Sequence, residues 1–195
     1  MTKELILFID QKMPFELEKK REKKEERLYE PIRIALEKRL QEYLNCQKES
    51  IGVRFVGKTH LEITASGKEL SEELKEVLDT DVLSILRVEK FSPDIMGFMQ
   101  RADYSPKELI TVEIKDEKIS IQSISRAKLY KDFFRARYGM LISSKGMGEE
   151  IKRFMSNRYE IRGDVIIAKY DEASSDFKFD NKFYSNIPEP FKTTK

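Results

Sequence analysis

Apolar residues recur at every fourth position within one long, highly charged segment. The four residues are Leu28, Ile32, Leu36 and Leu40. Residues four apart lie on the same side of an α-helix, so this spacing predicts a helix over 16–44 with one stripe facing a core. Pro31 lies inside the segment and indicates either a kink or a helix start near Tyr29.

The remainder of the chain mixes short apolar runs with further helical patterns. Runs typical of strands lie at 5–9, 51–56, 82–90, 95–99, 109–115, 140–143 and 165–170. Helical patterns lie at 66–78, 123–138 and 149–157, and Ser123 is the expected N-cap of the second. We therefore expect an α/β protein.

The length of 195 residues suits one domain with a real core. We expect that core at about 28–170, with an insertion or extension at 51–80 beside it. The tail, 171–195, is polar but contains several aromatic rings, which a wholly disordered segment would seldom have. Part of this tail is therefore expected to dock on the body or on a partner.

Charge and residue usage exclude several functions. Charged residues make up 37% of the chain, yet the net charge is only +2, so any basic surface must be local. Cys46 and His60 are the only residues of their types, which argues against nucleophilic triads, disulfides and thiolate metal clusters. No signal peptide or membrane-length apolar run is visible, and we expect a cytoplasmic protein without membrane contact. The abundance of Lys and Glu is typical of proteins from thermophiles.

The hairpin at 95–99 and 109–115 carries the clearest chemical pattern. If its turn is centred between residues 103 and 104, Asp94 lies directly across from Glu113, with Cβ atoms ~5 Å apart. Glu113 and Lys115 share one face of their strand, because side chains alternate along a strand. A solvated strand face produces the same Glu-x-Lys pattern, so the pairing with Pro93-Asp94 is what points to a site.

A hard divalent cation such as Mg²⁺ prefers oxygen ligands and keeps several waters. Asp94 and Glu113 offer two carboxylate oxygens, and the backbone carbonyl of Ile114 a third. Such an ion activates water for attack on a phosphodiester, and Lys115 can orient that water or stabilise charge on the phosphate. This chemistry needs no covalent nucleophile.

These motifs and their order resemble the PD-(D/E)xK nuclease superfamily, from about Leu28 to Ser144. The resemblance implies a restriction-endonuclease-like core with a central mixed β-sheet flanked by helices. It implies Asp94 and Glu113 as metal ligands, Lys115 as catalytic lysine, and Mg²⁺ as cofactor, with Mn²⁺ able to substitute. Many members add a glutamate from the first helix, for which Glu30 is the candidate and Glu26 the next.

Other features bear on the branch of the superfamily. Archaeal Holliday-junction resolvases are similar in size and element order, and a dimer is expected by resemblance only. One exonuclease branch carries Gln-x-x-x-Tyr on the helix after the Glu-x-Lys strand. This chain has Arg126 in place of the Gln and keeps Tyr130, which is expected in the core rather than on substrate.

The same helix is rich in basic residues. The candidates for nucleic-acid binding are Arg126, Lys128, Lys131 and Arg135. Lys128, Lys131 and Arg135 are spaced i, i+3 and i+7 and would form one stripe able to hold phosphates. An ordinary solvated helix face has the same composition.

Two main functions remain. The first is a metal-dependent nuclease acting on DNA, duplex or branched, with a structure-specific endonuclease as one form of this function. The alternative is a non-catalytic nucleic-acid-binding or assembly module on a nuclease-like scaffold, because a fold alone does not determine function. A scaffold that self-associates through its aromatic tail is a third option.

Overall fold

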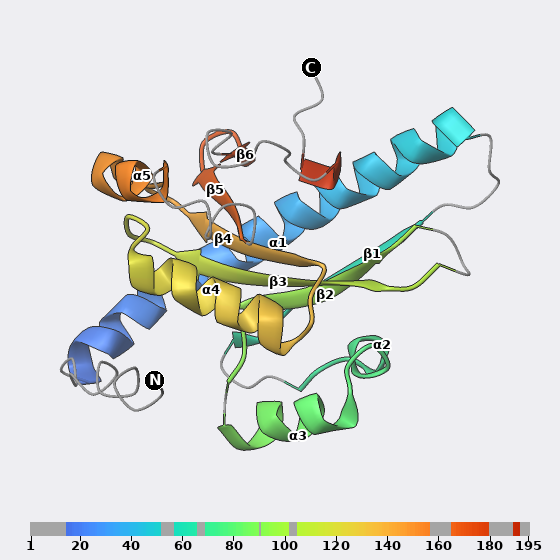
Figure 1. Ribbon diagram of the computed structural model, residues 1–195, viewed down its shortest axis with the longest axis horizontal. Coiled ribbons are helices and arrows are strands. Elements are labelled where there is room, and N and C mark those ends of the chain that lie inside the picture. The colour runs from blue at the N-terminus through green and yellow to red at the C-terminus, as the bar shows by residue number, and fades with distance from the viewer. Residues whose placement is uncertain are drawn as a thin grey trace.

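The computed structural model describes residues 15–51, 57–65, 69–89, 91–101, 105–156, 165–179 and 189–191. The strand expected at 5–9 lies outside these residues, as does nearly all of the one expected at 51–56. Within the described residues, six strands form one mixed sheet with helices packed around it (Figure 1). The expected α/β class with a central mixed sheet is confirmed.

The strands lie side by side in chain order. They are β1 (Lys58–Ile63), β2 (Ile95–Gln100), β3 (Glu108–Lys115), β4 (Tyr138–Ser143), β5 (Ile166–Asp171) and β6 (Asp176–Phe179). The first three are antiparallel, β4 and β5 run parallel to β3, and β6 turns back beside β5. Because parallel neighbours need a crossover, a helix follows β3 and another follows β4.

The helices are α1 (Phe15–Ile51), α2 (Glu72–Lys75), α3 (Thr80–Glu89), α4 (Ile121–Phe133) and α5 (Glu149–Ser156), followed by the 3-10 turn η3 (Glu189–Phe191). In Figure 1, α1 passes behind the sheet and α4 lies in front of it. The two helices thus cover opposite faces of the central strands.

The predicted stripe of α1 is buried along its whole length. Leu28, Ile32, Leu36 and Leu40 pack in one cluster with Ile95, Ile110, Val112 and Ile114 of the sheet. Burying each such side chain contributes about 1.5–3 kcal/mol, so this stripe is what holds α1 to the sheet. The helix continues on both sides of Pro31 and does not start there.

The opposite face of β2 and β3 carries a second cluster. Met96 and Leu109 of the sheet pack against Leu74 and Leu78 near α2 and against Tyr130 of α4. Tyr130 is 1% exposed, which confirms its expected place in the core. This cluster fastens α2, α3 and α4 over one face.

Elements in the first half of the chain differ from the expectations. Segment 82–90 forms helix α3 rather than a strand, because Val82, Leu83 and Leu86 turn one helical side toward the second cluster. Within segment 51–80, expected as an insertion beside the core, the described residues 58–63 form β1, which pairs with β2 as a strand of the main sheet. The helix expected over 66–78 is shortened in the described residues to α2.

The later elements also differ at their boundaries. Ser120, not Ser123, caps α4, and the two serines form a reciprocal capping box. The helix ends at Phe133 rather than at residue 138, and Gly139 is part of β4. The sheet continues past residue 170 into β6, and Phe177 and Phe191 are buried. Part of the tail therefore docks on the body, as expected.

Candidate active site

The register of the hairpin agrees with the one that the sequence predicts. Ile95 pairs with Val112 at the end of the β2–β3 ladder. Extending this register by one residue sets Asp94 across from Glu113. Ile114 packs under α1, and Glu113 is therefore directed to the other face of β3.

Asp94 is held by three neighbouring elements. Its Oδ2 accepts a 2.6 Å hydrogen bond from the backbone N–H of Ile114. Its own N–H donates to Val112 O at 3.0 Å, and its carbonyl accepts from Thr64 N at 2.9 Å. The hydroxyl of Tyr29 on α1 donates to the Asp94 carboxylate. These bonds leave the carboxylate little rotational freedom.

Lys115 lies between two carboxylates. Its Nζ is 3.0 Å from Glu25 Oε2 and 3.1 Å from Glu113 Oε1. Glu113 is only 2% exposed, and the Glu25 and Lys115 side chains are 10% and 17% exposed. A buried ion pair of this kind is held in place because separating the partners would leave a charge unpaired away from water.

Arg126 closes the cluster from α4. Its Nε is 3.5 Å from Glu113 Oε1 and donates to the Tyr130 hydroxyl at 2.9 Å. Its guanidinium also lies 5.6 Å from the centre of the Tyr130 ring. The arginine that replaces glutamine in the Gln-x-x-x-Tyr pattern is thus a cation facing the carboxylates.

Burial and the neighbouring charges shift the pKa values of Asp94, Glu25 and Lys115. Burial, with a further contribution from Glu113, raises the pKa of Asp94 to about 7, although Lys115 opposes the shift. Burial also raises the pKa of Glu25. Burial alone would lower the pKa of Lys115, but the carboxylates of Glu113, Glu25 and Asp94 outweigh it and raise that pKa. Lys115 therefore stays protonated at neutral pH.

The donor set fits a hydrated hard cation. Within the part of the chain that is described, no three His, Cys, Asp or Glu side chains converge closely enough to hold a metal by themselves. Mg²⁺ is commonly bound by one or two carboxylates and completed by waters and substrate oxygens. Asp94 and Glu113 provide such a pair, and the N–H of Ile114 keeps the Asp94 carboxylate in position.

The structure brings Asp94, Glu113 and Lys115 together but not Glu30. Glu30 is exposed and bonded to Arg33 at 2.7 Å, whereas Glu25 is the α1 carboxylate in contact with Lys115. Glu25 was missed, although a signal was present. It lies three residues before Leu28 and four before Tyr29, so a charged residue continues the apolar stripe inward.

The predicted basic stripe of α4 is not continuous. Arg126 belongs to the carboxylate cluster, and Lys128 pairs with Asp132 at 3.5 Å. Lys131 packs against β4, where its Cβ would lie 2.6 Å from a Cβ added at Gly139. Arg135 lies beyond the end of the helix. Helical spacing therefore relates the first three of these residues but not Arg135.

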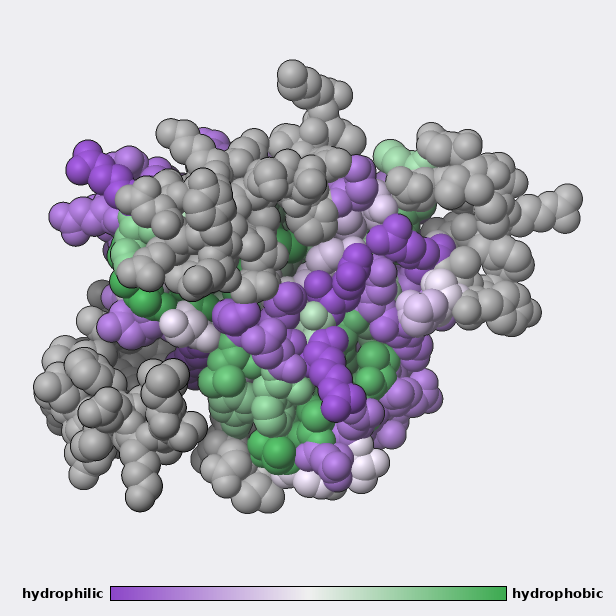
Figure 2. All heavy atoms as spheres, viewed as in Figure 1, coloured by the Kyte–Doolittle hydropathy of each residue, from purple (hydrophilic) through white to green (hydrophobic). Residues whose placement is uncertain are grey.

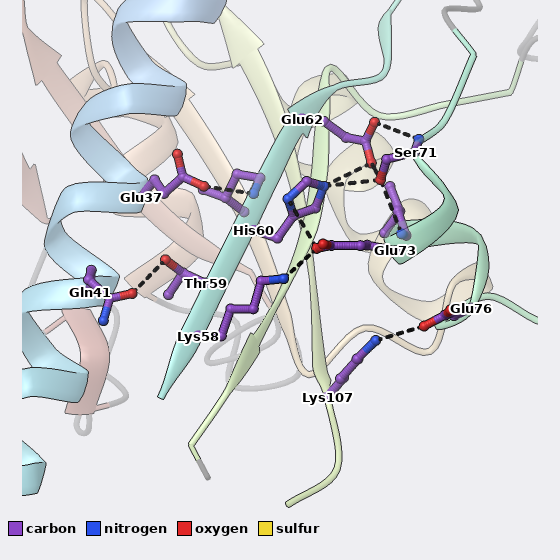
Figure 3. A network of polar contacts seen from close by, with 12 residues as sticks. Glu37, Gln41, Lys58, Thr59, His60, Glu62, Ser71, Glu73, Glu76 and Lys107 are labelled. Atoms are coloured by element: carbon purple, nitrogen blue, oxygen red, sulfur yellow. Dashed lines mark hydrogen bonds and ion pairs between the residues drawn. The ribbon is translucent and has the colours of Figure 1, made fainter. Parts of the chain in front are cut away.

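A second polar cluster lies on β1 (Figure 3). His60 Nε2 is 3.1 Å from Ser71 Oγ and 3.3 Å from Glu62 Oε1. Ser71 is the N-cap of α2: its hydroxyl accepts from Leu74 N and lies 2.7 Å from Glu62 Oε1 as donor. This hydroxyl is committed to joining α2 to β1, so the cluster has a structural role despite its Ser, His and Glu residues.

Within the described part of the chain, none of the helices combines the length and apolar character that crossing a membrane requires. Comparison of the chain with known protein families, curated proteins and solved structures gives no match. The functional assignment therefore rests on the side chains of this site.

Proposed function

We propose that this chain is a Mg²⁺-dependent nuclease with a restriction-endonuclease-like core, acting on DNA. The observation that carries the proposal is the meeting of Asp94, Glu113 and Lys115 at the ends of β2 and β3. The element order supports it. Apart from α2 and α3, which lie between β1 and β2, the series α1, β1, β2, β3, α4, β4 is the one that the PD-(D/E)xK resemblance implies.

Each residue has a distinct role in this proposal. Asp94 and Glu113 hold the cation, and the carbonyl of Ile114 is the proposed third protein ligand. The ion, when bound, acts as a Lewis acid on the phosphate and lowers the pKa of a bound water. Lys115 is a protonated ammonium, so it acts as a donor to the attacked phosphate or to water and not as a general base.

Glu25 positions Lys115 in this proposal. If Glu113 were the only carboxylate partner of Lys115, the ammonium would shift with every rotation of the Glu113 side chain. Two acceptors at 3.0 Å and 3.1 Å hold the ammonium between α1 and β3 instead. Placement within a fraction of an ångström matters because catalysis by fixed charges depends on geometry.

A specific contact favours the alternative of a non-catalytic nucleic-acid-binding module. Glu113 Oε1 already faces two cations, Lys115 and Arg126, and so has its charge satisfied by side chains. If Arg126 cannot leave, no dication reaches Glu113. The exposed fraction of the Arg126 side chain, 58%, argues that it can move away.

The test is cutting of plasmid, linear duplex, single-stranded and branched DNA in Mg²⁺ or Mn²⁺. We expect Asp94→Asn and Lys115→Met to lower the rate at least about 100-fold, because each removes a charge that stabilises the transition state. Asp81→Asn, an exposed change on α3, is the matched control and should cut normally.

Cutting that persists unchanged in Asp94→Asn would show that the activity arises elsewhere and would end the nuclease assignment for this site. Titration calorimetry separates the two functions. Binding of Mg²⁺ to wild type that is lost in Asp94→Asn supports the nuclease. DNA binding without any binding of Mg²⁺ or Mn²⁺ supports the module.

A further inference from the structure

A cavity of about 630 Å³ lies at the far end of α4 from the carboxylate cluster. The apolar residues that line it, called its floor below, include Leu109 of β3 and the rings of Phe133 and Phe134. The two rings meet edge to face with centroids 5.0 Å apart. The face drawn in Figure 2 shows apolar surface over α3 and the end of α4, bordered by hydrophilic side chains.

Cations outnumber anions around this cavity. Lys107, Lys131, Arg135 and Arg137 line it, against two carboxylates, Asp79 and Glu108. Arg135 Nη1 is 3.8 Å from Asp79 and its side chain is 86% exposed, and Lys107 reaches Glu76 at 3.3 Å. The Arg135 pair is long and solvent-exposed, of the kind that contributes little and exchanges partners readily. The Lys107 side chain is half-buried, and its partner Glu76 is exposed. In a chain with a net charge of +2, this is a local concentration of positive charge.

The backbone at the rim is unusual. Arg135 has φ of 51°, in the left-handed region where the residue after a helix is usually glycine. Lys131 O accepts from Ala136 N at 2.8 Å, so the helix end itself is properly closed. An arginine here carries a conformational cost that glycine would avoid, and it places a guanidinium at the cavity.

The cavity and the carboxylate cluster share one face of the sheet. Leu109 and Glu113 are four residues apart on β3, so their side chains point the same way and lie ~13 Å apart along the strand. Arg126 and Phe134 are eight residues apart along α4, about 12 Å.

We propose that this cavity binds an unpaired nucleotide of a nucleic-acid strand, ~13 Å along β3 from the carboxylate cluster. The base would lie on the apolar floor beside Phe133, since stacking on aromatic rings is how proteins hold single strands without reading their sequence. The flanking phosphates would meet Arg135, Arg137 and Lys131. The inference rests on the proposed function only in taking a nucleic acid as the ligand.

The test compares two double variants in fluorescence anisotropy with a labelled oligothymidylate, in EDTA so that nothing is cut. Arg135→Gly with Arg137→Gln removes two rim charges, and glycine suits the left-handed backbone. Arg153→Gln with Lys38→Gln, exposed cations on α5 and α1, is the control with equal charge loss. We expect the rim variant to bind about tenfold more weakly, with a salt slope lower by about 1.4, or ~0.7 for each lost phosphate contact. The control should match wild type.

Cutting in Mg²⁺ is measured on the same proteins. Equal affinity and salt slope for the rim variant and wild type would overturn the cavity proposal, whether or not wild type cuts DNA. Rim-dependent binding by a wild type that never cuts would support the cavity and overturn the nuclease. A wild type that binds neither oligothymidylate nor duplex would overturn both. A labelled blunt duplex is expected to be less sensitive to the rim change, and equal sensitivity would overturn the preference for an unpaired nucleotide.

Discussion

Glu25 shows how one residue of a site can follow from the fold rather than from a motif. Glu25 and Glu30 are both acidic residues of α1, but five residues of helix separate them by roughly 140° around its axis. Glu30 therefore turns to solvent and Arg33, while Glu25 meets Lys115. Asp94, Glu113 and Lys115 could be predicted because they lie on two strands of one hairpin with a defined register. Glu25 and Arg126 reach the site through tertiary packing, which no local spacing reports.

The two glutamates provide a matched pair of variants. We expect Glu25→Gln to lower the rate of DNA cutting about 10–100-fold at saturating Mg²⁺, because Lys115 loses one of its two charged partners. Glu30→Gln should leave the rate unchanged, since Glu30 is bonded to Arg33 at the surface. Single-turnover kinetics on one duplex substrate measures both. Equal effects of the two changes would contradict the assignment of Glu25.

Asp94 makes the stability of the metal-free protein depend on pH. Its pKa is about 7 in the folded protein and has an ordinary value of 3.8. Between these values the folded protein holds a proton that the unfolded chain has released, so the free energy of unfolding falls as pH rises. The raised pKa of Glu25 acts in the same direction. Above about pH 7 the contribution of Asp94 is constant.

Urea unfolding at pH 5 and pH 8 in EDTA measures this dependence. We compare the free energy of unfolding of Asp94→Asn with that of wild type at each pH. This difference should shift in favour of the variant by about 1–3 kcal/mol from pH 5 to pH 8, because asparagine stays neutral at both pH values. A difference between the two proteins that does not change with pH would show that Asp94 does not titrate in this window.

At the scale of the elements, periodicity predicted α1 and the central hairpin but failed where apolar runs are short. The run from Val82 to Val88 is apolar enough for a buried strand or a helix, and periodicity alone does not separate the two. Packing against Leu74 and Tyr130 selects the helix. β1 looked peripheral because its place beside β2 depends on the close approach of the two strands at Gly97.

Gly97 is the residue that permits this approach. A Cβ added there would meet the carbonyl oxygen of His60 and lie 2.7 Å from Leu61 Cα, both backbone atoms of β1. We expect Gly97→Ala to lower the free energy of unfolding by about 3 kcal/mol, because backbone cannot move aside as a side chain can. Gly148→Ala, where nothing lies within 4 Å, should change it by less than about 0.5 kcal/mol. Similar losses in both variants would contradict this reading of the β1–β2 contact.

For the whole molecule, the class and the middle of the sheet were predictable, and its edges were not. β2, β3 and β4 are continuous apolar or alternating runs, and their order gave the central strands correctly. β6 is a short, polar strand that exists because it pairs with β5. Phe191 is buried against the Tyr138 ring from far along the chain, with centroids 5.3 Å apart. Such contacts depend on where distant segments come to lie, which the local pattern does not encode.

The pairing of Arg126 with Glu113 bears on the stability of the protein in the absence of a metal ion. With Asp94 largely protonated below pH 7, the negative groups Glu25 and Glu113 are matched by the positive groups Lys115 and Arg126. We therefore expect the chain to stay folded without divalent cations, unlike small metal-binding domains, which unfold when a chelator removes their metal. If the proposed nuclease function holds, we expect the exposed Arg126 guanidinium to leave Glu113 and contact a phosphate of the DNA only when a dication binds Glu113.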